Sequence, residues 1–355
     1  MCYFYRVNLH EKYIKRCIQL AKNGLGNTYP NPMVGSVIVY NDTIIGEGWH
    51  KKAGEPHAEV NAINAVKDKS LLSAATIYVS LEPCSHLGRT PPCANLIVEK
   101  GIINVVIGII DSNSKVSGAG VAFLKNNGCN VLVGVLESEC YNLNKRFFTF
   151  HNKRRPFIIL KWAETKDGFI DKVRDATSDK LPNWISNEYS QQYVHKMRAK
   201  EHAILVGTNT VLNDNPVLNV RSWSGENPVR IFIDREFKAP SDCKLLDGSI
   251  KTIVFTAAEQ KEKTNENVIF EKINFSKNVP QQICAVLYKY EIQSMIIEGG
   301  AKTLQGFIDV NLWDEAYVFV GDVFFNDGLM APKLNKASFE TIKISNDILI
   351  VYKNY

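Results

Sequence analysis

Three short apolar runs constrain the fold of this chain most strongly. They are TIYVSL (76–81), NVVIGII (104–110) and NVLVGVL (130–136). Strands that are apolar at nearly every position are buried on both faces, which is typical of parallel sheets covered by helices. The pattern therefore predicts an α/β fold, with helices over 94–100 and 121–127 between the strands.

Other elements of this first part are predicted from hydrophobic periodicity and from residues that favour turns or helix starts. We predict a helix over 10–23, strands over 34–40 and 43–50 joined by a hairpin at Asn41-Asp42, and a helix that Pro56 opens and that runs to Val66. Proline suits the first helical position because the N–H it lacks is not needed there.

The rest of the chain repeats the α/β alternation. Strands are predicted over 157–163, 202–207, 229–234, 252–255, 294–300 and 316–321, with helices over 187–200 and 301–309 and a surface loop over 257–280. A chain of 355 residues is long enough for two domains. The basic, non-periodic run from His151 to Pro156 separates the two patterns, so we predict domains over 1–150 and 151–355.

Composition and charge narrow the class of protein. The net charge of +5 is small for this length, which does not suggest a nucleic-acid partner but would suit small anionic substrates. We expect no membrane partner, since no apolar run approaches the roughly 18 residues of a membrane span. The start of the chain carries charges where a signal peptide needs an apolar run, so a cytoplasmic location is expected. In such a chain, most of the eight cysteines are expected to be small buried side chains rather than disulfide partners.

A metal-ligand pattern lies in the first part of the chain. His57 precedes Glu59 by two residues, Pro83-Cys84 follows a predicted strand, and Cys93 precedes a short predicted helix. One imidazole and two thiolates form a set that zinc favours, and a catalytic zinc keeps its fourth position for water. Zinc lowers the pKa of that water from about 16 to near 7, which makes hydroxide available for attack on a ring carbon that bears an amine. Glu59 is the candidate for carrying a proton from the attacking water to the leaving amine.

Helix geometry limits this interpretation. Residues two apart on a helix point about 200° away from each other, so His57 and Glu59 share one metal only if it lies over the helix end. Pro56 places both residues in the first turn. The positive end of the helix dipole would favour an anion there, and the helix after Cys93 would favour a thiolate in the same way.

Two non-catalytic interpretations of these residues remain. Zinc deaminases of nucleobases carry H-x-E and P-C-x-x-C, whereas eight residues separate Cys84 from Cys93 here. A closed structural zinc site could use His86 or His50 as a fourth ligand, but Glu59 would then have no role. Alternatively, the cysteines and the histidine could be buried side chains without a metal.

The second part of the chain gives weaker signals. Glu298-Gly299-Gly300 ends a predicted strand and opens a helix, where backbone N–H groups can bind phosphate, although such a turn is often only structural. The sequence there is not G-x-G-x-x-G, so a standard Rossmann domain is not predicted. Residues 213–216 (NDNP) form a turn cluster. Arg198 and Arg221 could bind a substrate phosphate or could be solvated surface residues.

Longer motifs make a family resemblance visible. EPHAEVNAI (55–63) and LEPCSHLGRTPPC (81–93) closely resemble the bifunctional riboflavin-biosynthesis deaminase/reductase family, which inserts GRTPP-type residues between its two cysteines. TYPNPMVGSVIV (28–39) and GEGWHKKAGEPHAE (46–59) resemble it as well, as do LKWAETKDGFI (160–170), residues 184–221 and IIEGGAKTLQGF (296–307). The resemblance covers essentially the whole chain.

The resemblance implies a fold and two reactions. The N-terminal domain would have the three-layer α/β/α fold of cytidine deaminases, and the C-terminal domain would resemble dihydrofolate reductase. The first domain would deaminate 2,5-diamino-6-ribosylamino-4(3H)-pyrimidinone 5′-phosphate with zinc. The second would reduce the ribosyl group to ribityl with NADPH, giving 5-amino-6-ribitylamino-uracil 5′-phosphate.

The resemblance also implies residue roles. Glu59 would transfer the proton, and His57, Cys84 and Cys93 would bind zinc. Substrate contacts would be Asn31 and His50 in the deaminase, with His86 and Arg89 as weaker candidates, and Arg198, Leu218, Arg221 and Glu298 in the reductase. Contacts to the dinucleotide would be Ala163, Trp184, Thr210, Asp214 and the turn Gly300, Ala301, Lys302, Thr303, Leu304, Gln305 and Gly306. Asp214 or a water molecule would supply the proton of the reductase step.

Some features leave other functions open. Residues 171–183 are longer than usual for the family, and Pro182 stands where many relatives have a serine that contacts substrate. A deaminase of another nucleobase or of RNA, with a degenerate second part, is one alternative. A zinc-stabilised α/β protein that binds a nucleotide or a partner without catalysis is another. Family habit suggests a homodimer or larger homo-oligomer.

Overall fold

The structure is a computed structural model that describes residues 2–85, 91–112, 117–174, 183–258 and 265–355, with the side chains of residues 2–8 left out. It divides into two compact units, Met1–Lys153 and Arg154–Tyr355. The break lies inside the basic run that follows His151. Each unit is described by itself.

The N-terminal unit is built on a five-stranded sheet in the order β2-β1-β3-β4-β5. Its strands are β1 (Gly35–Tyr40), β2 (Thr43–Trp49), β3 (Thr76–Leu81), β4 (Asn104–Ile109) and β5 (Asn130–Val133). β1 pairs antiparallel with both β2 and β3. β3, β4 and β5 pair in parallel, which confirms the pairing predicted from their apolar sequences.

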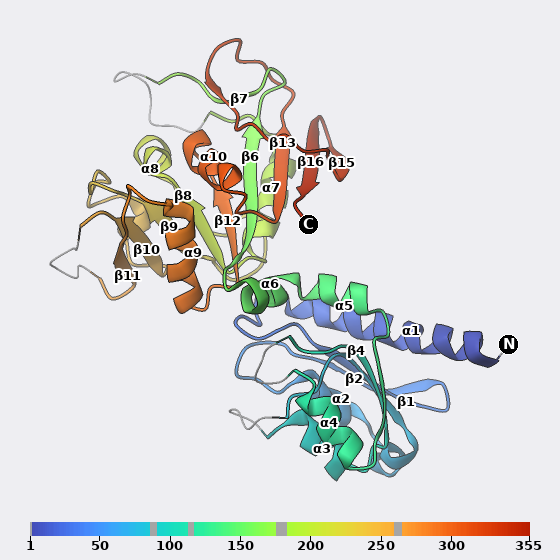
Figure 1. Ribbon diagram of the computed structural model, residues 1–355. Coiled ribbons are helices and arrows are strands. Elements are labelled where there is room, and N and C mark those ends of the chain that lie inside the picture. The colour runs from blue at the N-terminus through green and yellow to red at the C-terminus, as the bar shows by residue number, and fades with distance from the viewer. Residues whose placement is uncertain (1, 86–90, 113–116, 175–182, 259–264) are drawn as a thin grey trace. The chain divides into compact units, whose positions relative to one another are not determined.

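Helices cover both faces of this sheet and complete three layers (Figure 1). They are α1 (Cys2–Ala21), α2 (Ala58–Ala65), α3 (Cys93–Glu99), α4 (Ala119–Asn126), α5 (Glu137–Leu143) and α6 (Lys145–Lys153), with 3-10 turns at Lys22–Gly24 and Lys69–Ala74. Alternate residues of β1 face opposite layers, because side chains alternate along a strand. Val37 and Val39 pack in the core under α1, whereas Ile38 packs in the core under α2, α3 and α4.

Several predicted bounds in this unit were wrong. α1 begins eight residues earlier than the predicted start at 10. α2 begins at Ala58 rather than at Pro56, because His57 is the N-cap and its backbone is extended. β5 ends at Val133, and its predicted last residues turn toward α5. The helices α5 and α6 were not predicted. α5 has seven residues and α6 has nine, so each is too short to repeat a helical period more than about twice.

The C-terminal unit contains a nine-stranded sheet in the order β11-β10-β9-β8-β12-β6-β13-β16-β15. Its strands are β6 (Phe157–Glu164), β8 (Ala203–Val206), β9 (Val229–Ile233), β10 (Thr252–Thr256), β11 (Val268–Lys272), β12 (Ser294–Glu298), β13 (Glu315–Val320), β15 (Glu340–Ile344) and β16 (Asp347–Lys353). The pairs from β11 to β13 are parallel, and β16 joins β13 and β15 antiparallel. A separate two-stranded sheet pairs β7 (Phe169–Asp171) with β14 (Leu329–Met330).

Among the described residues of this unit, four helices flank the large sheet. They are α7 (Glu188–Arg198), α8 (Thr208–Asp214), α9 (Val279–Lys289) and α10 (Ala301–Asp309), with a 3-10 turn at Lys244–Leu246. Leu287 of α9 and Phe307 of α10 pack in one core, whereas Met197 of α7 and Val211 of α8 pack in cores formed by the opposite set of strand residues. The unit is therefore layered on both faces of the sheet (Figure 1).

The surface loop predicted over 257–280 was wrong in part. Within it, residues 268–272 form β11, which pairs in parallel with β10, and α9 begins at Val279. β11 is an edge strand of five residues of which only Val268 is fully buried, so it lacks the continuous apolar run of the central strands. α8, β15 and β16 were not predicted either. Five described cysteines outside the metal pattern are buried, as expected: Cys17, Cys129, Cys140, Cys243 and Cys284.

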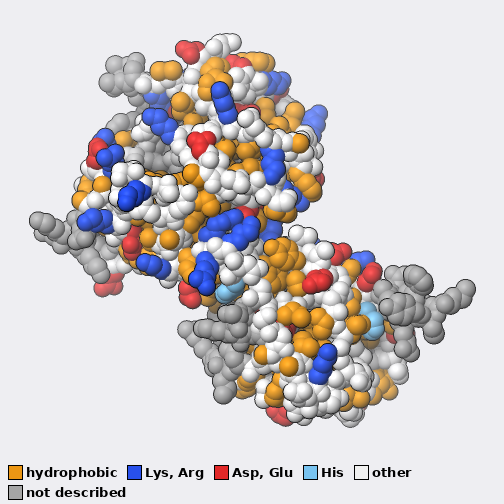
Figure 2. Space-filling model, in the orientation of Figure 1, with side chains coloured by type: hydrophobic (Ala, Val, Ile, Leu, Met, Phe, Trp, Pro, Cys, Tyr) orange, Lys and Arg blue, Asp and Glu red, His pale blue; other side chains and the backbone are white. Residues whose placement is uncertain are grey.

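Two surface features bear on the class of protein. No helix among the described residues is long and apolar enough to cross a bilayer. On the face drawn in Figure 2, Lys and Arg side chains lie among Asp and Glu side chains in both units.

The contact between α1 and β1 gives a stability prediction. A Cβ atom added at Gly35 would lie 2.0 Å from the carbonyl oxygen of Cys17. Gly35→Ala should therefore destabilise the N-terminal unit by about 1–3 kcal/mol through overpacking. Gly306→Ala is the control, because the added atom meets nothing within 4 Å and should be neutral or slightly stabilising. Calorimetric unfolding measures both, and an unchanged transition for Gly35→Ala would contradict the close packing.

Candidate active sites

Three ligand atoms meet in the N-terminal unit. Nδ1 of His57 lies 3.6 Å from Sγ of Cys84 and 3.3 Å from Sγ of Cys93. All three atoms lie within 4.8 Å of one another, which is the spacing of donors around a single ion. The donor set of one nitrogen and two sulfurs fits zinc with one position left for water or substrate.

The ends of three elements bring these residues together. His57 is the N-cap of α2, Cys84 follows the end of β3, and Cys93 is the first residue of α3. The backbone N–H of Cys93 points to Sγ of Cys84 at 3.4 Å, and the N–H of Ala94 donates to the carbonyl oxygen of Cys84 at 3.1 Å. The site therefore lies over the N-termini of two helices, as the geometric condition on His57 and Glu59 requires.

The local charges favour a thiolate. Hydrogen bonds from Cys93 and His57 lower the pKa of Cys84 well below its ordinary value. The pKa of Cys93 is raised, because it shares its proton with the Cys84 sulfur and is buried. The pair therefore holds one negative charge, and a bound cation would draw the second proton off as well.

Glu59 lies in the first turn of α2 and is only 3% exposed. Burial raises the pKa of its carboxyl to about 7. A divalent cation held by the three ligands would lower that pKa again. A carboxyl group whose pKa lies near the working pH can both accept and release a proton.

Asn31 and His50 form a pair beside the ligands. Nε2 of His50 lies 3.1 Å from Nδ2 of Asn31, and Nδ1 lies 3.3 Å from the carbonyl oxygen of Pro56. Nδ1 must donate to that oxygen, so Nε2 accepts from the amide and the imidazole is neutral. Burial lowers the pKa of His50 in agreement with this state. Both of its nitrogens are engaged, which argues against His50 as a fourth metal ligand.

Sequence reasoning missed the residue that holds the Asn31 loop. Oδ1 of Asn144 accepts the N–H of Met33 at 2.8 Å, and its Nδ2 donates to the Met33 carbonyl at 2.8 Å. Asn144 lies 111 residues further along the chain, between α5 and α6. A lone asparagine at such a distance carries no local signal.

A cavity of about 1070 Å³ lies in the C-terminal unit. It opens where β6, β8 and β12 end, which is the edge where parallel α/β sheets bind ligands. Nearly all the predicted reductase residues line it: Ala163, Trp184, Arg198, Thr210, Asp214, Leu218, Arg221, Glu298, Gly300, Ala301, Lys302, Thr303 and Leu304.

The other predicted positions lie elsewhere. Among the described residues, Gln305 and Gly306 are not part of the cavity wall. Gln305 instead donates to Asp309 at 2.7 Å and accepts the N–H of Lys333 at 2.8 Å. His86, Arg89 and Pro182 lie outside the described residues.

A charged cluster forms one wall of the cavity. Nε of Arg198 donates to Oε1 of Glu298 at 3.0 Å, and Nη2 donates to Oε2 at 2.7 Å. Lys161, which sequence reasoning missed, places Nζ 3.9 Å from the same carboxylate. Burial alone would raise the pKa of Glu298, but the charges of Arg198 and Lys161 lower it to about 2. The cluster carries a net positive charge, which suits an anionic ligand.

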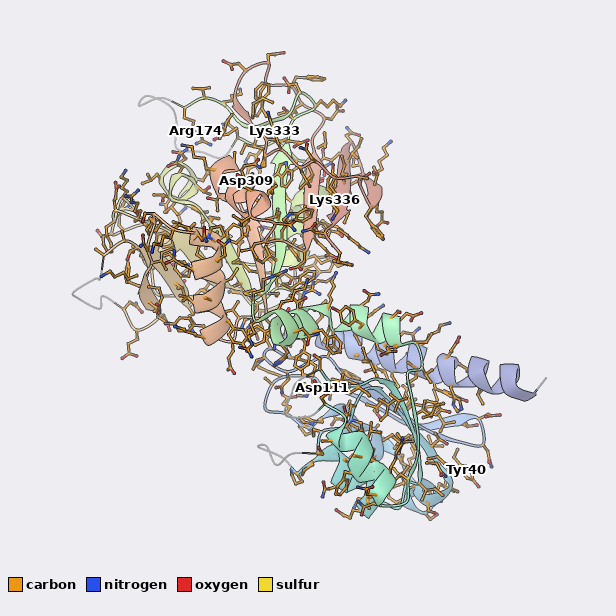
Figure 3. All side chains as sticks on the ribbon, in the orientation of Figure 1. Tyr40, Asp111, Arg174, Asp309, Lys333 and Lys336 are labelled. Carbon is orange, nitrogen blue, oxygen red and sulfur yellow. The ribbon has the colours of Figure 1, made fainter. Side chains whose placement is uncertain are left out.

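Asp214 lies on the cavity wall at the end of α8 and is also paired. Nη2 of Arg174 donates to its Oδ1 at 3.1 Å, and Nε of Arg174 donates to Asp171 at 2.9 Å. Arg174, labelled in Figure 3, was not predicted. Burial raises the pKa of Asp214 despite this partner.

The turn after β12 fits a dinucleotide phosphate. Gly299 and Gly300 adopt φ values of 116° and 69°, which L side chains rarely adopt. A Cβ atom at Gly299 would lie 2.8 Å from Oγ1 of Thr210, and one at Gly207 would lie 2.5 Å from Oγ1 of Thr303. Because these glycines have no side chains, the backbone at the N-terminus of α10 is uncovered, and its N–H groups can donate to phosphate oxygens.

Comparison with known proteins matches both units. The family model of the cytidine and deoxycytidylate deaminase zinc-binding region matches residues 7–109, and that of the RibD C-terminal domain matches residues 156–343. The riboflavin biosynthesis protein RibD of Aquifex aeolicus is 39% identical over 98% of this chain and 99% of its own length. This chain belongs to the RibD family.

Other RibD proteins are similar to this chain over most of its length. That of Escherichia coli is 34% identical over 87% of each chain. The crystal structure of a diaminohydroxyphosphoribosylaminopyrimidine deaminase/5-amino-6-(5-phosphoribosylamino)uracil reductase from Thermotoga maritima superposes with a TM-score of 0.86, at 37% identity over 98% of this chain and 99% of that chain. A RibD structure from Acinetobacter baumannii gives a TM-score of 0.86 at 32% identity over 97% of this chain and 98% of its own. The α/β fold predicted for both domains is confirmed.

The metal site of this RibD chain gives a direct prediction. Purified protein should hold one zinc ion per chain. Cys93→Ala should lose it, because the two remaining ligands, His57 and Cys84, are too few to hold the ion. Cys129→Ala is the matched control, since Cys129 is a buried free thiol of the same unit and should leave zinc bound. Elemental analysis after dialysis measures the content. Full zinc in Cys93→Ala would remove Cys93 from the ligand set.

The Arg198–Glu298 pair gives a pH prediction. The pKa of Glu298 in the folded chain, about 2, lies below its ordinary value of 4.5. The pair therefore contributes stability that is present above pH 4.5 and is lost as the pH falls toward 2, about 3 kcal/mol in all. Wild type should exceed Glu298→Gln in unfolding temperature at pH 7, and the difference should shrink below pH 4.5. Glu266→Gln, at an exposed site, should follow wild type throughout. A pH-independent difference would contradict the ionised pair.

Proposed function

We propose that this RibD protein catalyses two consecutive reactions, one in each domain. The deaminase domain, 1–150, removes an amine from 2,5-diamino-6-ribosylamino-4(3H)-pyrimidinone 5′-phosphate. The reductase domain, 151–355, then reduces the ribosyl group to ribityl with NADPH. The observation that carries this proposal is the meeting of His57, Cys84 and Cys93 beside the buried Glu59.

His57, Cys84 and Cys93 would hold zinc, which supplies a Lewis acid that makes water nucleophilic near neutral pH. Glu59 then accepts the proton of the attacking water on its carboxylate and releases it to the departing amine. Its burial supports this role, because bulk water does not compete for the proton. The same carboxylate serves both transfers, so from the first turn of α2 it must reach both the attacking water and the departing amine.

Asn31 and His50 would orient the pyrimidine ring. The neutral imidazole accepts one amide hydrogen of Asn31 through Nε2, so the amide oxygen of Asn31 is directed to other donors. An amine or ring N–H of the substrate is a suitable donor. The Asn144 contacts to Met33 hold this loop in place.

In the reductase domain, NADPH supplies the hydride, and the protein supplies position and charge. Backbone N–H groups of Gly300 to Thr303 would bind phosphate, while Leu304, whose N–H donates to the Gly300 carbonyl, lines the same wall with Ala163, Trp184, Thr210 and Asp214. Arg198, Leu218, Arg221 and Glu298 would contact the ribosyl phosphate. Arg221 is the more available cation, because the fork of Arg198 is already bound to Glu298.

The proton of the reductase step has a candidate source in Asp214. Burial raises the pKa of this side chain, which favours a carboxyl group that can donate. Arg174 opposes that state by pairing with it. A shift of the Arg174 side chain when ligand enters would release Asp214 for proton transfer, and a water molecule is the alternative donor.

Location and assembly extend the proposal. We place the protein in the cytoplasm, where a reducing environment keeps thiols such as Cys84 and Cys93 available for metal. We also propose a homo-oligomer, a dimer or larger, which sedimentation velocity tests directly.

The proposed function is tested by measuring both products at once. With the ribosylamino-pyrimidinone phosphate as the only substrate, ammonia release and NADPH oxidation should occur in equal amounts. Glu59→Gln should lower ammonia release by roughly 10²- to 10⁴-fold, since it removes the proton carrier. The variant should keep its zinc and should still oxidise NADPH when given the deaminated intermediate.

Glu99→Gln is the control, because Glu99 is an exposed carboxylate of the same unit. Ammonia release that survives in Glu59→Gln would exclude Glu59 as the proton carrier. Ammonia without NADPH oxidation in wild type would leave the deaminase in place and remove the reductase assignment.

A further inference from the structure

A buried carboxylate that no step of the proposed reaction uses lies next to the metal site. Glu82 follows β3, precedes Pro83-Cys84, and is 4% exposed. Its Oε1 accepts the N–H of Val121 at 3.0 Å. Its Oε2 accepts the N–H of Gly118 at 3.0 Å and that of Asp111 at 3.2 Å.

These contacts join three separate parts of the N-terminal unit. Asp111, labelled in Figure 3, lies just beyond the end of β4, while Gly118 is the N-cap of α4 and Val121 lies in its first turn. Burying a carboxylate is costly unless hydrogen bonds replace its water. Glu82 meets that cost with backbone N–H groups at a helix start, where the dipole also favours an anion. The carboxylate therefore fixes the start of α4 against the end of β3.

The first turn of α4 packs directly against the carbonyl group of Pro83. A Cβ atom at Gly120 would lie 2.1 Å from the carbonyl oxygen of Pro83 and 3.1 Å from Oε1 of Glu82. The N–H of Glu82 also donates to the carbonyl of Ile109 at 2.9 Å. The peptide that leads into Cys84 is thus held between β4 and the first turn of α4.

Cys84 is held from the other side by α3. Its carbonyl accepts the N–H of Ala94, and its Sγ accepts the N–H of Cys93. Two anchors therefore determine where the Cys84 sulfur lies: the start of α3 beyond it and the Glu82 contacts before it. The distance of 3.6 Å from this sulfur to Nδ1 of His57 depends on both.

We propose that Glu82 is a positioning residue for the metal site, acting through Pro83 to place the Cys84 thiolate beside His57 and Cys93. It touches neither the metal nor the substrate. The inference rests on the proposed zinc site and adds a residue to its support. Partners that orient metal ligands without binding the ion typically change metal affinity by 10- to 100-fold when altered.

The test compares Glu82→Gln with wild type. The amide keeps the shape of the side chain but turns an NH₂ group toward backbone N–H groups, so at least one of the three hydrogen bonds is lost. Zinc affinity, measured by competition with a chelator, should fall by about 10- to 100-fold. With cobalt in place of zinc, the sulfur-to-metal charge-transfer band should shift or weaken. Reduction of the deaminated intermediate with NADPH should be unchanged.

Two further variants make the result decisive. Glu139→Gln changes an exposed carboxylate on α5 and should leave zinc affinity and the cobalt spectrum as in wild type. Gly120→Ala displaces Pro83 while keeping the Glu82 side chain, and it should weaken zinc binding as Glu82→Gln does. If Glu82→Gln fails to fold, Gly120→Ala decides.

The outcomes separate this inference from the proposed function. A wild-type chain that binds no zinc would overturn the metal site and the role of Glu82 with it. Wild-type zinc affinity and an unaltered cobalt spectrum in folded Glu82→Gln, or in folded Gly120→Ala, would overturn the positioning role alone.

Discussion

The ends of parallel strands are the constraint on which both candidate sites depend. A central parallel strand is buried on both faces, so chemistry can only reach solvent where the strand stops and the next helix starts. Cys84 follows β3, and Glu298 closes β12 just before the glycine turn. Helix N-termini lie at the same edges, and their N–H groups favour anions. One architectural rule therefore places the candidate metal ligands in one unit and the cavity in the other.

Local sequence was sufficient where each residue of a site stands in a recognisable short motif. The pattern of His57, Glu59, Cys84 and Cys93 identified the metal cluster, because each residue lies at an element end that the sequence marks with proline or a helix start. The central strands were predicted for the same reason, since their apolar runs are continuous. Edge strands such as β11 were missed because they lack such a run: only Val268 of β11 is fully buried, and Glu271 and Lys272 are charged.

Partners that lie far apart in the chain could not be predicted. Arg198 and Glu298 are 100 residues apart, and nothing in either segment says that they form a bidentate pair. The pair changes the interpretation of both residues, since an arginine that looks available for phosphate is already bound to a carboxylate. Lys161 adds a second cation to the cluster, on a strand whose first four residues are apolar core. Family resemblance located the pocket, but only the structure gave its charge balance.

The bond between Asn144 and Met33 has a consequence for how the protein is made. Met33 lies in the loop that carries Asn31, and its anchor is translated 111 residues later. Phe147 and Phe148, which cover the sheet beside α1, emerge later still. Until that part of the chain has left the ribosome, the Asn31 loop lacks this anchor, although His57, Cys84 and Cys93 are already synthesised. The candidate metal ligands are therefore translated before the helices that complete their own unit.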